Sequence, residues 1–149
     1  MNNRVILLVE DNPDDAELTL LALKENQIVN EVVVAHDGVE ALDYLFSGGR
    51  HEGNAAGDMP CLVLLDLKLP KMGGLEVLRQ LRADERTRLL PVVILTSSNE
   101  ERDLIDGYSS GANSYVRKPV SFAQFLDAVR QVCNYWLALN EPLPMFGGA

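Results

Sequence analysis

The residues with the clearest chemical potential in this sequence are acidic, and they lie where apolar runs end. Glu10 and Asp11 follow the first apolar run, Asp66 follows the third, and Lys118 closes the fifth. Carboxylates a few ångströms apart repel one another, and one takes up a proton unless a cation intervenes. Mg²⁺ prefers oxygen ligands and would relieve this repulsion, with the lysine as a second positive charge.

The elements that must bring these residues together are five short runs alternating with longer segments of helical character. Most of the runs are rich in Val, Ile and Leu without alternation, as in parallel strands that are covered on both faces. The pattern predicts an α/β fold, (βα)5, with a doubly wound five-stranded parallel sheet and right-handed crossovers. The expected strands are residues 5–9, 32–35, 61–65, 92–96 and, more polar and at an edge, 114–118.

Helix starts are indicated by capping residues. Asn12 precedes a proline, and Ser98 and Ser121 each have an acid or amide three residues later, the capping-box spacing. The expected N-caps are Asn12, Asp37, Ser98 and Ser121.

The last helix repeats apolar residues at steps of three and four from Phe122 to Leu137, so one stripe should face the sheet. The helix is about a turn longer than the fold needs, and we expect the end that carries Trp136 to project beyond the core. Pro142 should end it. We therefore assign residues 1–140 to one domain and 141–149 to a C-terminal extension.

Composition bounds the possible partners. The chain has 149 residues, 47% of them hydrophobic and 23% charged, with a net charge of −9. This acidity argues against nucleic acid and anionic membranes, which attract clustered Lys and Arg. We also expect no signal peptide and no transmembrane helix.

Several smaller features have ordinary explanations. Cys61 and Cys133 are expected as buried free thiols of a cytoplasmic protein rather than a disulfide or a metal pair. His36 and His51 are assigned to the surface. The Gly-rich segment 47–60 matches no phosphate-binding motif and enters a strand, so we interpret it as a surface loop.

In a doubly wound sheet, ligands bind outside the carboxyl ends of the strands. Glu10, Asp11, Asp66, Thr96 and Lys118 all end expected strands and should share one edge. Each has an ordinary structural explanation when it is taken alone; for Asp11 that explanation is helix capping. Their conjunction at one edge favours a functional site.

Four motifs carry a resemblance to a known family: "LLVEDN", "LLDLKLP", "ILTSS" and "YVRKP". Over roughly residues 4 to 135 the sequence resembles the response-regulator receiver domain of two-component signalling, which implies the flavodoxin-like receiver fold. The resemblance implies that Asp66 accepts a phosphoryl group from a phosphohistidine of a sensor histidine kinase. It also implies Mg²⁺ held by Asp11, Asp66 and the backbone carbonyl of Lys68, with Glu10 acting through water.

The same resemblance assigns switch residues. Lys118 and Thr96 would contact the phosphoryl oxygens, and Tyr115 would turn inward behind the threonine. The output surface would be the fourth helix, fifth strand and fifth helix. Pro119 has a structural role, and the resemblance implies a cis Lys118–Pro119 bond that aims the lysine inward.

The resemblance leaves the partner open between two contexts. The length and the tail resemble stand-alone receivers of bacterial phytochrome kinases, and the alternative is another histidine kinase, with this protein as phosphorelay intermediate or phosphate sink. We expect a switch rather than an enzyme, and a homodimer through the output surface extended by residues 136 to 146.

Two rival families fit less well. A hydrolase of the haloacid dehalogenase type needs a second aspartate at the position of Lys68. A flavodoxin-like flavin carrier would need a phosphate loop where this chain has "EDNPDDAE".

Overall fold

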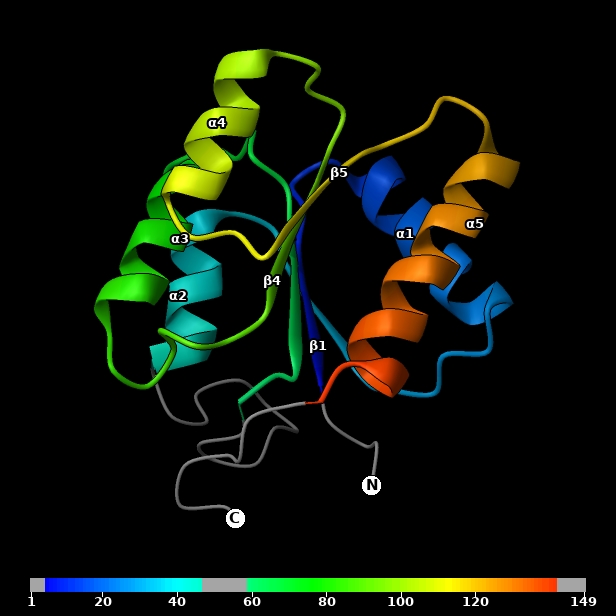
Figure 1. The fold of residues 1–149 in the computed structure, drawn as a ribbon, viewed down its shortest axis with the longest axis horizontal. Helices are drawn as coiled ribbons and strands as arrows, with labels where there is room; N and C mark the ends of the chain where they lie inside the picture. The colour runs from blue at the N-terminus through cyan, green and yellow to red at the C-terminus, as the bar shows by residue number, and fades with distance from the viewer. Residues whose placement is uncertain (1–4, 47–58, 142–149) are drawn as a thin grey trace.

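The computed structural model describes residues 5–46 and 59–141, in which strands and helices alternate as the sequence predicts (Figure 1). The strands are β1 (Ile6–Val9), β2 (Val32–Ala35), β3 (Leu62–Leu65), β4 (Val92–Thr96) and β5 (Ser114–Arg117). The helices are α1 (Pro13–Glu25), α2 (Gly38–Phe46), α3 (Gly74–Ala83), α4 (Glu101–Ser109), α5 (Phe122–Cys133) and the π-helix η1 (Asn134–Leu139).

The five strands form one parallel sheet in the order β2-β1-β3-β4-β5. This confirms the doubly wound (βα)5 prediction and the edge position of β5. The strand order reverses between β1 and β3, which lie next to each other at the centre, and this is where ligands bind in such sheets. Since all strands run the same way, their carboxyl ends meet at one edge.

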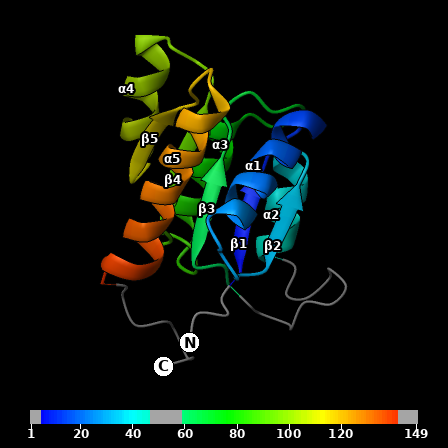
Figure 2. The ribbon, with the colours of Figure 1, turned by 90° about the vertical axis from the view of Figure 1, so that its right-hand side faces the viewer.

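Helices cover both faces of the sheet, with α1 and α5 on one face and α2, α3 and α4 on the other (Figures 1 and 2). Alternate residues of β1 therefore enter different clusters. Leu7 and Val9 pack toward α2 and α3, whereas Ile6 and Leu8 pack toward α1. This burial on both faces explains why the strands read as continuous apolar runs.

Three of the four expected N-caps are confirmed. The Asn12 side chain accepts hydrogen bonds from the amides of Asp14 and Asp15 at 2.9 and 3.1 Å. Asp37 accepts from the Glu40 amide at 2.7 Å, and Ser121 from the Gln124 amide at 3.3 Å. These bonds satisfy amides that the first turn of a helix leaves without partners.

The Ser98 prediction is wrong by two residues, because the N-cap of α4 is Glu100. The Ser98 hydroxyl accepts from the Glu100 amide at 3.3 Å and donates to the Asp103 carboxylate at 2.6 Å. Ser98 thus lies in the loop between β4 and α4 and contacts the helix from outside.

The end of the last helix differs from the prediction in two ways. After Cys133 the helix widens into η1, and Trp136 and Leu137 pack against the core instead of projecting beyond it. The exposed apolar residues here are Tyr135 and Leu139, at 48% and 67%. The extension from Pro142 onward lies outside the described residues.

The expectations for the cysteines and for His36 are met in part. Cys133 is buried, as predicted, but Cys61 is only half-buried because it lies just before β3 begins, so its predicted burial is wrong. Neither cysteine forms a disulfide among the described residues, and His36 lies exposed beside Glu40. Burial raises the pKa of the Cys133 thiol to about 12, so it stays protonated. His51 and most of the Gly-rich segment lie outside the described residues.

Among the residues that the structure describes, no helix combines the length and the apolar character that crossing a bilayer requires.

Candidate functional site

The carboxylate of Asp66 lies directly beyond β3, the central strand. Its backbone amide donates to the Val9 carbonyl at 3.1 Å, so the sheet ladder with β1 holds its position. One carboxylate oxygen accepts from the Leu67 amide at 2.8 Å, and the residue is only 8% exposed. The backbone thus orients one oxygen of Asp66, and the other remains available for chemistry.

The start of α3 supports this strand end from behind. The Gly74 amide donates to the Leu67 carbonyl at 3.0 Å. A Cβ atom at Gly74 would lie 2.3 Å from the Asp66 carbonyl oxygen and 2.8 Å from the Leu67 Cα, too close for any side chain. Only glycine allows the helix to approach the end of β3 this closely. Sequence reasoning missed this contact, because two adjacent glycines do not show which backbone atoms approach them.

Three carboxylates converge at the site, as predicted. Glu10, Asp11 and Asp66 each offer an oxygen, and these oxygens lie within 4.8 Å of one another. Glu10 is 2% exposed, whereas Asp11 is exposed. An all-oxygen donor set with a solvent-facing side fits a hard cation such as Mg²⁺, which keeps several waters.

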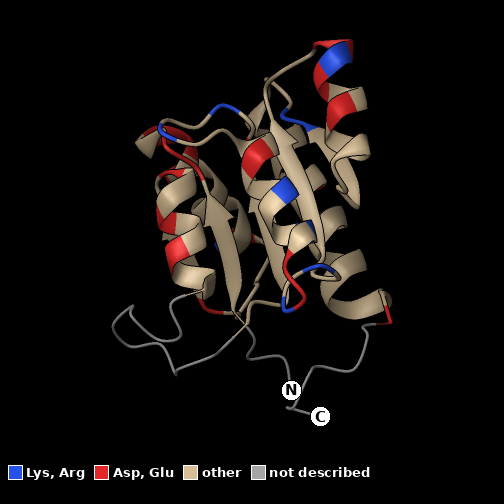
Figure 3. Ribbon diagram, turned by 90° about the vertical axis from the view of Figure 1, so that its left-hand side faces the viewer, with Lys and Arg blue, Asp and Glu red and all other residues tan. Residues whose placement is uncertain are grey.

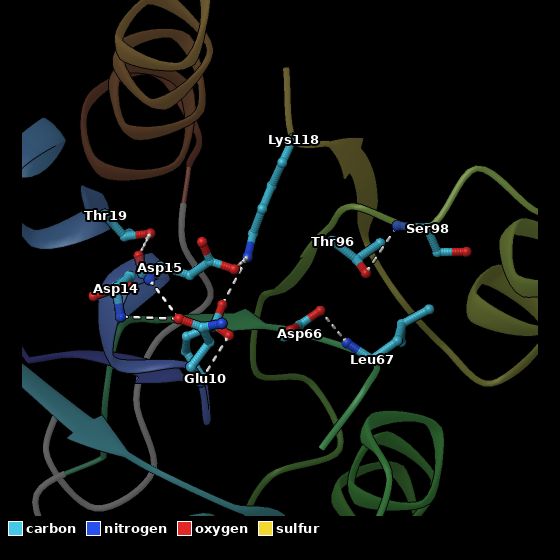
Figure 4. A network of polar contacts seen from close by, with 10 residues as sticks. Glu10, Asp14, Asp15, Thr19, Asp66, Leu67, Thr96, Ser98 and Lys118 are labelled. Atoms are coloured by element: carbon cyan, nitrogen blue, oxygen red, sulfur yellow. Dashed lines mark hydrogen bonds and ion pairs between the residues drawn. The ribbon is translucent and has the colours of Figure 1, made fainter. Parts of the chain in front are cut away.

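The cluster contains one lysine. The Lys118 ammonium lies 2.7 Å from Glu10 Oε1 and 3.5 Å from Asp15 Oδ2, and Figure 4 shows its side chain pointing to both. The Lys118 amide donates to the Thr96 carbonyl at 2.8 Å, which places the residue in register at the end of β5. Sequence reading predicted the lysine but not Asp15, since no spacing rule links the third residue of a helix to a distant strand end.

The lysine reaches the site with a trans peptide bond before Pro119. The described residues contain no cis peptide bond, so the cis Lys118–Pro119 prediction is wrong. Pro119 is half-buried. A trans X-Pro bond is the intrinsically favoured isomer, and Lys118 points inward without the change.

Burial and ion pairing shift the pKa values of this pair. Burial raises the pKa of Glu10 to about 7, with the Asp66 charge adding to the rise and Lys118 opposing it. Burial lowers the pKa of Lys118, but its bond to Glu10 and the charges of Glu10, Asp66 and Asp15 outweigh that effect and raise it overall. The lysine is therefore a fixed positive charge, while Glu10 can take up a proton near neutral pH.

Thr96 ends β4, and Tyr115 is the second residue of the neighbouring strand β5, where it pairs with Ile94. Thr96 is fully buried, and its hydroxyl oxygen accepts from the Ser98 amide at 3.3 Å. Tyr115 is half-buried on β5, and its ring lies against α4, where a Cβ atom at Gly107 would come within 3.2 Å of it. Lys68, two residues after Asp66, is exposed.

The site therefore assembles a buried carboxylate, two further carboxylates, a lysine and a buried threonine from four strand ends. This arrangement can hold a divalent cation and balance the charge of a phosphoryl group on Asp66.

Comparisons with known proteins support this description. The family model of the response regulator receiver domain matches residues 6–130. The chain is 43% identical over 137 residues to the probable methanogenesis regulatory protein FilR2 of Methanothrix harundinacea, covering 92% of this chain and 86% of that protein.

Two stand-alone regulators are also similar. Response regulator Rcp1 of Synechocystis is 36% identical over 134 residues, covering 90% of this chain and 89% of Rcp1. Its Mn²⁺-bound crystal structure superposes with a TM-score of 0.81 over 95% of this chain and 99% of that one, at 35% identity. The bacteriophytochrome response regulator AtBRR is 52% identical, with a TM-score of 0.72 over 95% and 96% of the two chains.

Proposed function

Because the chain belongs to the response regulator receiver family, we propose that it accepts a phosphoryl group on Asp66 from a phosphohistidine of a sensor histidine kinase. One observation supports the proposal most directly. A buried Asp66, oriented by the Leu67 amide, lies beside two further carboxylates and a lysine at the carboxyl edge of the sheet.

The residues divide the work of transfer. The free carboxylate oxygen of Asp66 attacks phosphorus, an oxygen–phosphorus bond forms, and the nitrogen–phosphorus bond of phosphohistidine breaks, leaving the imidazole with the electron pair. Lys118 then exchanges its Glu10 contact for a phosphoryl oxygen, and the Thr96 hydroxyl donates to another. Positioning and charge neutralisation provide most of the catalysis.

A divalent cation completes the proposal. Mg²⁺ would be held by Asp11, Asp66 and the Lys68 carbonyl, with Glu10 through water, and would neutralise charge on the phosphoryl oxygens. The carboxylate cluster fits such an ion, and the similar Rcp1 has been solved with bound Mn²⁺.

Phosphoryl transfer to Asp66 can be tested directly. Incubation with Mg²⁺ and acetyl phosphate should add one phosphoryl group through an acid-stable, base-labile acyl phosphate. Asp66→Asn should abolish the labelling, while Asp84→Asn, at a partly exposed carboxylate beyond α3 that pairs with Arg86, should leave it intact. Labelling of the Asp66→Asn variant at the wild-type rate would remove the acceptor assignment.

The partner that we favour is a phytochrome-type histidine kinase. The similarity to AtBRR and Rcp1 over almost the whole chain supports this choice, since AtBRR is a bacteriophytochrome response regulator. The alternative is another histidine kinase, with this protein as a phosphorelay intermediate or phosphate sink. Phosphotransfer from a purified bacteriophytochrome that is at least tenfold faster than from unrelated kinases would favour the first.

We further infer that the protein is a switch rather than a hydrolase, because the place of a second catalytic aspartate is occupied by exposed Lys68. Phosphorylation would move Thr96 and Tyr115 and change the α4–β5–α5 surface. Ile105 and Tyr108 of this surface are 55% and 51% exposed. If each protein molecule hydrolysed many phosphodonor molecules, with an acyl phosphate lifetime of seconds, that result would instead favour the hydrolase.

The output surface is also our proposed dimer interface, extended by the C-terminal arm of residues 136 to 146. The exposed Tyr135 and Leu139 of η1 place apolar side chains at the start of this arm. Sedimentation of the full chain and of a chain ending at Asn140, which keeps the core residues Trp136 and Leu137, tests the arm. A dimer that weakens on truncation supports it, and identical behaviour of the two chains refutes it.

A further inference from the structure

Ser98 is a junction between the acceptor site and helix α4. Its amide donates to the Thr96 hydroxyl oxygen at 3.3 Å, and its own hydroxyl donates to Asp103 Oδ2 at 2.6 Å. The same hydroxyl accepts from the Glu100 amide at 3.3 Å. Ser98 is 6% exposed, so these contacts are shielded from solvent. Asp103, in the first turn of the mixed-charge helix α4 (Figure 3), is half-buried.

The Tyr115 hydroxyl lies next to this junction without a bond. It is fully buried and, among the side-chain atoms that the structure describes, it is the one buried polar atom with no hydrogen-bond partner. Burial raises the pKa of Tyr115, an interaction with the Ser98 hydroxyl that falls short of a well-formed hydrogen bond lowers it, and the charge of Asp103 raises it again. After burial, Ser98 and Asp103 are therefore the polar side chains with the largest influence on the pKa of this hydroxyl.

A serine hydroxyl has one proton to donate and two lone pairs to accept with. Asp103 takes the proton and the Glu100 amide uses one lone pair, so a single acceptor position remains for Tyr115. The short hydrogen bond to Asp103 fixes the direction of the remaining Ser98 lone pair. The Tyr115 hydroxyl makes no hydrogen bond to that lone pair. A buried hydroxyl without a bond destabilises the conformation that contains it.

We propose that Asp103 is a positioning residue that holds the Ser98 hydroxyl in an orientation that does not accept from Tyr115. The inward Tyr115 conformation then has a higher free energy before phosphorylation. The inference rests on the proposed function, in which inward Tyr115 accompanies a phosphoryl group on Asp66. Any change that lets Ser98 accept from Tyr115 stabilises the inward state. By linkage, such a change must also tighten binding of a phosphoryl mimic at Asp66.

Beryllofluoride, which occupies an acceptor carboxylate as an acyl phosphate does, measures this coupling. With Mg²⁺ present, Asp103→Ala should bind beryllofluoride about fivefold more tightly than wild type, as followed by amide NMR shifts. Asp103→Asn keeps an oxygen that accepts from Ser98 and should restore the wild-type affinity. Asp106→Ala, which removes an equal charge from the same helix without contacting Ser98, is the matched control and should also bind like wild type.

The Tyr115→Phe background separates this role from a general effect on α4. Without the tyrosine hydroxyl, Asp103→Ala should give no gain, because Ser98 has nothing to accept from. An equal gain in that background, or equal affinities of wild type and Asp103→Ala, would overturn the inference. Two other outcomes would refute the proposed function instead. In the first, wild-type protein shows no response to beryllofluoride; in the second, the Asp66→Asn variant responds as wild type does.

Discussion

Gly74→Ala is the substitution that most directly tests how the fold supports the acceptor. The new Cβ would lie 2.3 Å from the Asp66 carbonyl oxygen and 2.8 Å from the Leu67 Cα, and both are backbone atoms that cannot rotate away. Its neighbour Gly73 offers a matched control. A Cβ atom there would come no closer than 3.9 Å to the Leu67 carbonyl oxygen, an ordinary contact.

The size of the effect follows from these distances. Carbon–oxygen contacts in proteins lie at roughly 3.3 Å or more, so α3 and the end of β3 must separate by about 1 Å. Forcing a methyl group into a filled site costs about 1–3 kcal/mol. The stabilisation of the helix by alanine, about 0.5–1 kcal/mol, offsets part of that cost. We expect Gly74→Ala to lower the free energy of unfolding by about 1–2 kcal/mol and Gly73→Ala to change it by less than about 0.5 kcal/mol.

Urea unfolding followed by circular dichroism measures both variants, and acetyl phosphate labelling reports on the acceptor. Gly74→Ala should also label Asp66 more slowly, because the displaced backbone carries the carboxylate with it. If Gly74→Ala proves as stable and as reactive as Gly73→Ala, the close approach of α3 does not position Asp66.

Three further predictions concern charged side chains. Because the pKa of Glu10 in the folded protein, about 7, lies above its ordinary value of 4.5, the metal-free fold should lose on the order of 2 kcal/mol as pH rises from 4.5 through 7; urea titrations should show this loss, and Glu10→Gln should flatten it. Asp11→Asn should weaken Mg²⁺ binding at least tenfold in calorimetry yet raise the melting temperature of the metal-free protein, because one like charge leaves the cluster; an unchanged Mg²⁺ affinity would contradict the ligand role. Arg82→Lys should lower the free energy of unfolding by about 2 kcal/mol, since the guanidinium donates to the carbonyls of Gly111 and Leu90 and to the Asn113 side chain, a fork that lysine cannot reproduce; a urea midpoint equal to that of wild type would count against this clamp.

The sequence predicted those parts of the fold that depend on local pattern. Strands that are covered by helices on both faces must be apolar throughout. The apolar runs in the sequence therefore predicted the bounds of the strands to within one residue. Asn12 and Ser121 were recognised as caps because their partners lie two or three residues away. The predicted site residues Glu10, Asp11 and Asp66 meet because parallel strands end at a common edge.

Features that depend on distant contacts were mistaken or missed. Ser98 has the capping-box spacing, but the Asp103 carboxylate takes its hydroxyl proton, and the helix starts later. The contact of Lys118 with Asp15 joins elements far apart in the chain, and the approach of Gly74 to Asp66 depends on how the loop between β3 and α3 folds back. No local pattern encodes such distances, since they follow from how helices settle on the sheet.

The ion pair between Glu10 and Lys118 has a consequence for protein synthesis. The two residues are 108 positions apart, and the lysine directly follows the last strand. A nascent chain exposes the acidic residues first and acquires their cation only when β5 has left the ribosome. Incomplete chains therefore carry Glu10 and Asp66 without the lysine that balances their charge, so the complete charge arrangement of the site arises only together with the completed domain.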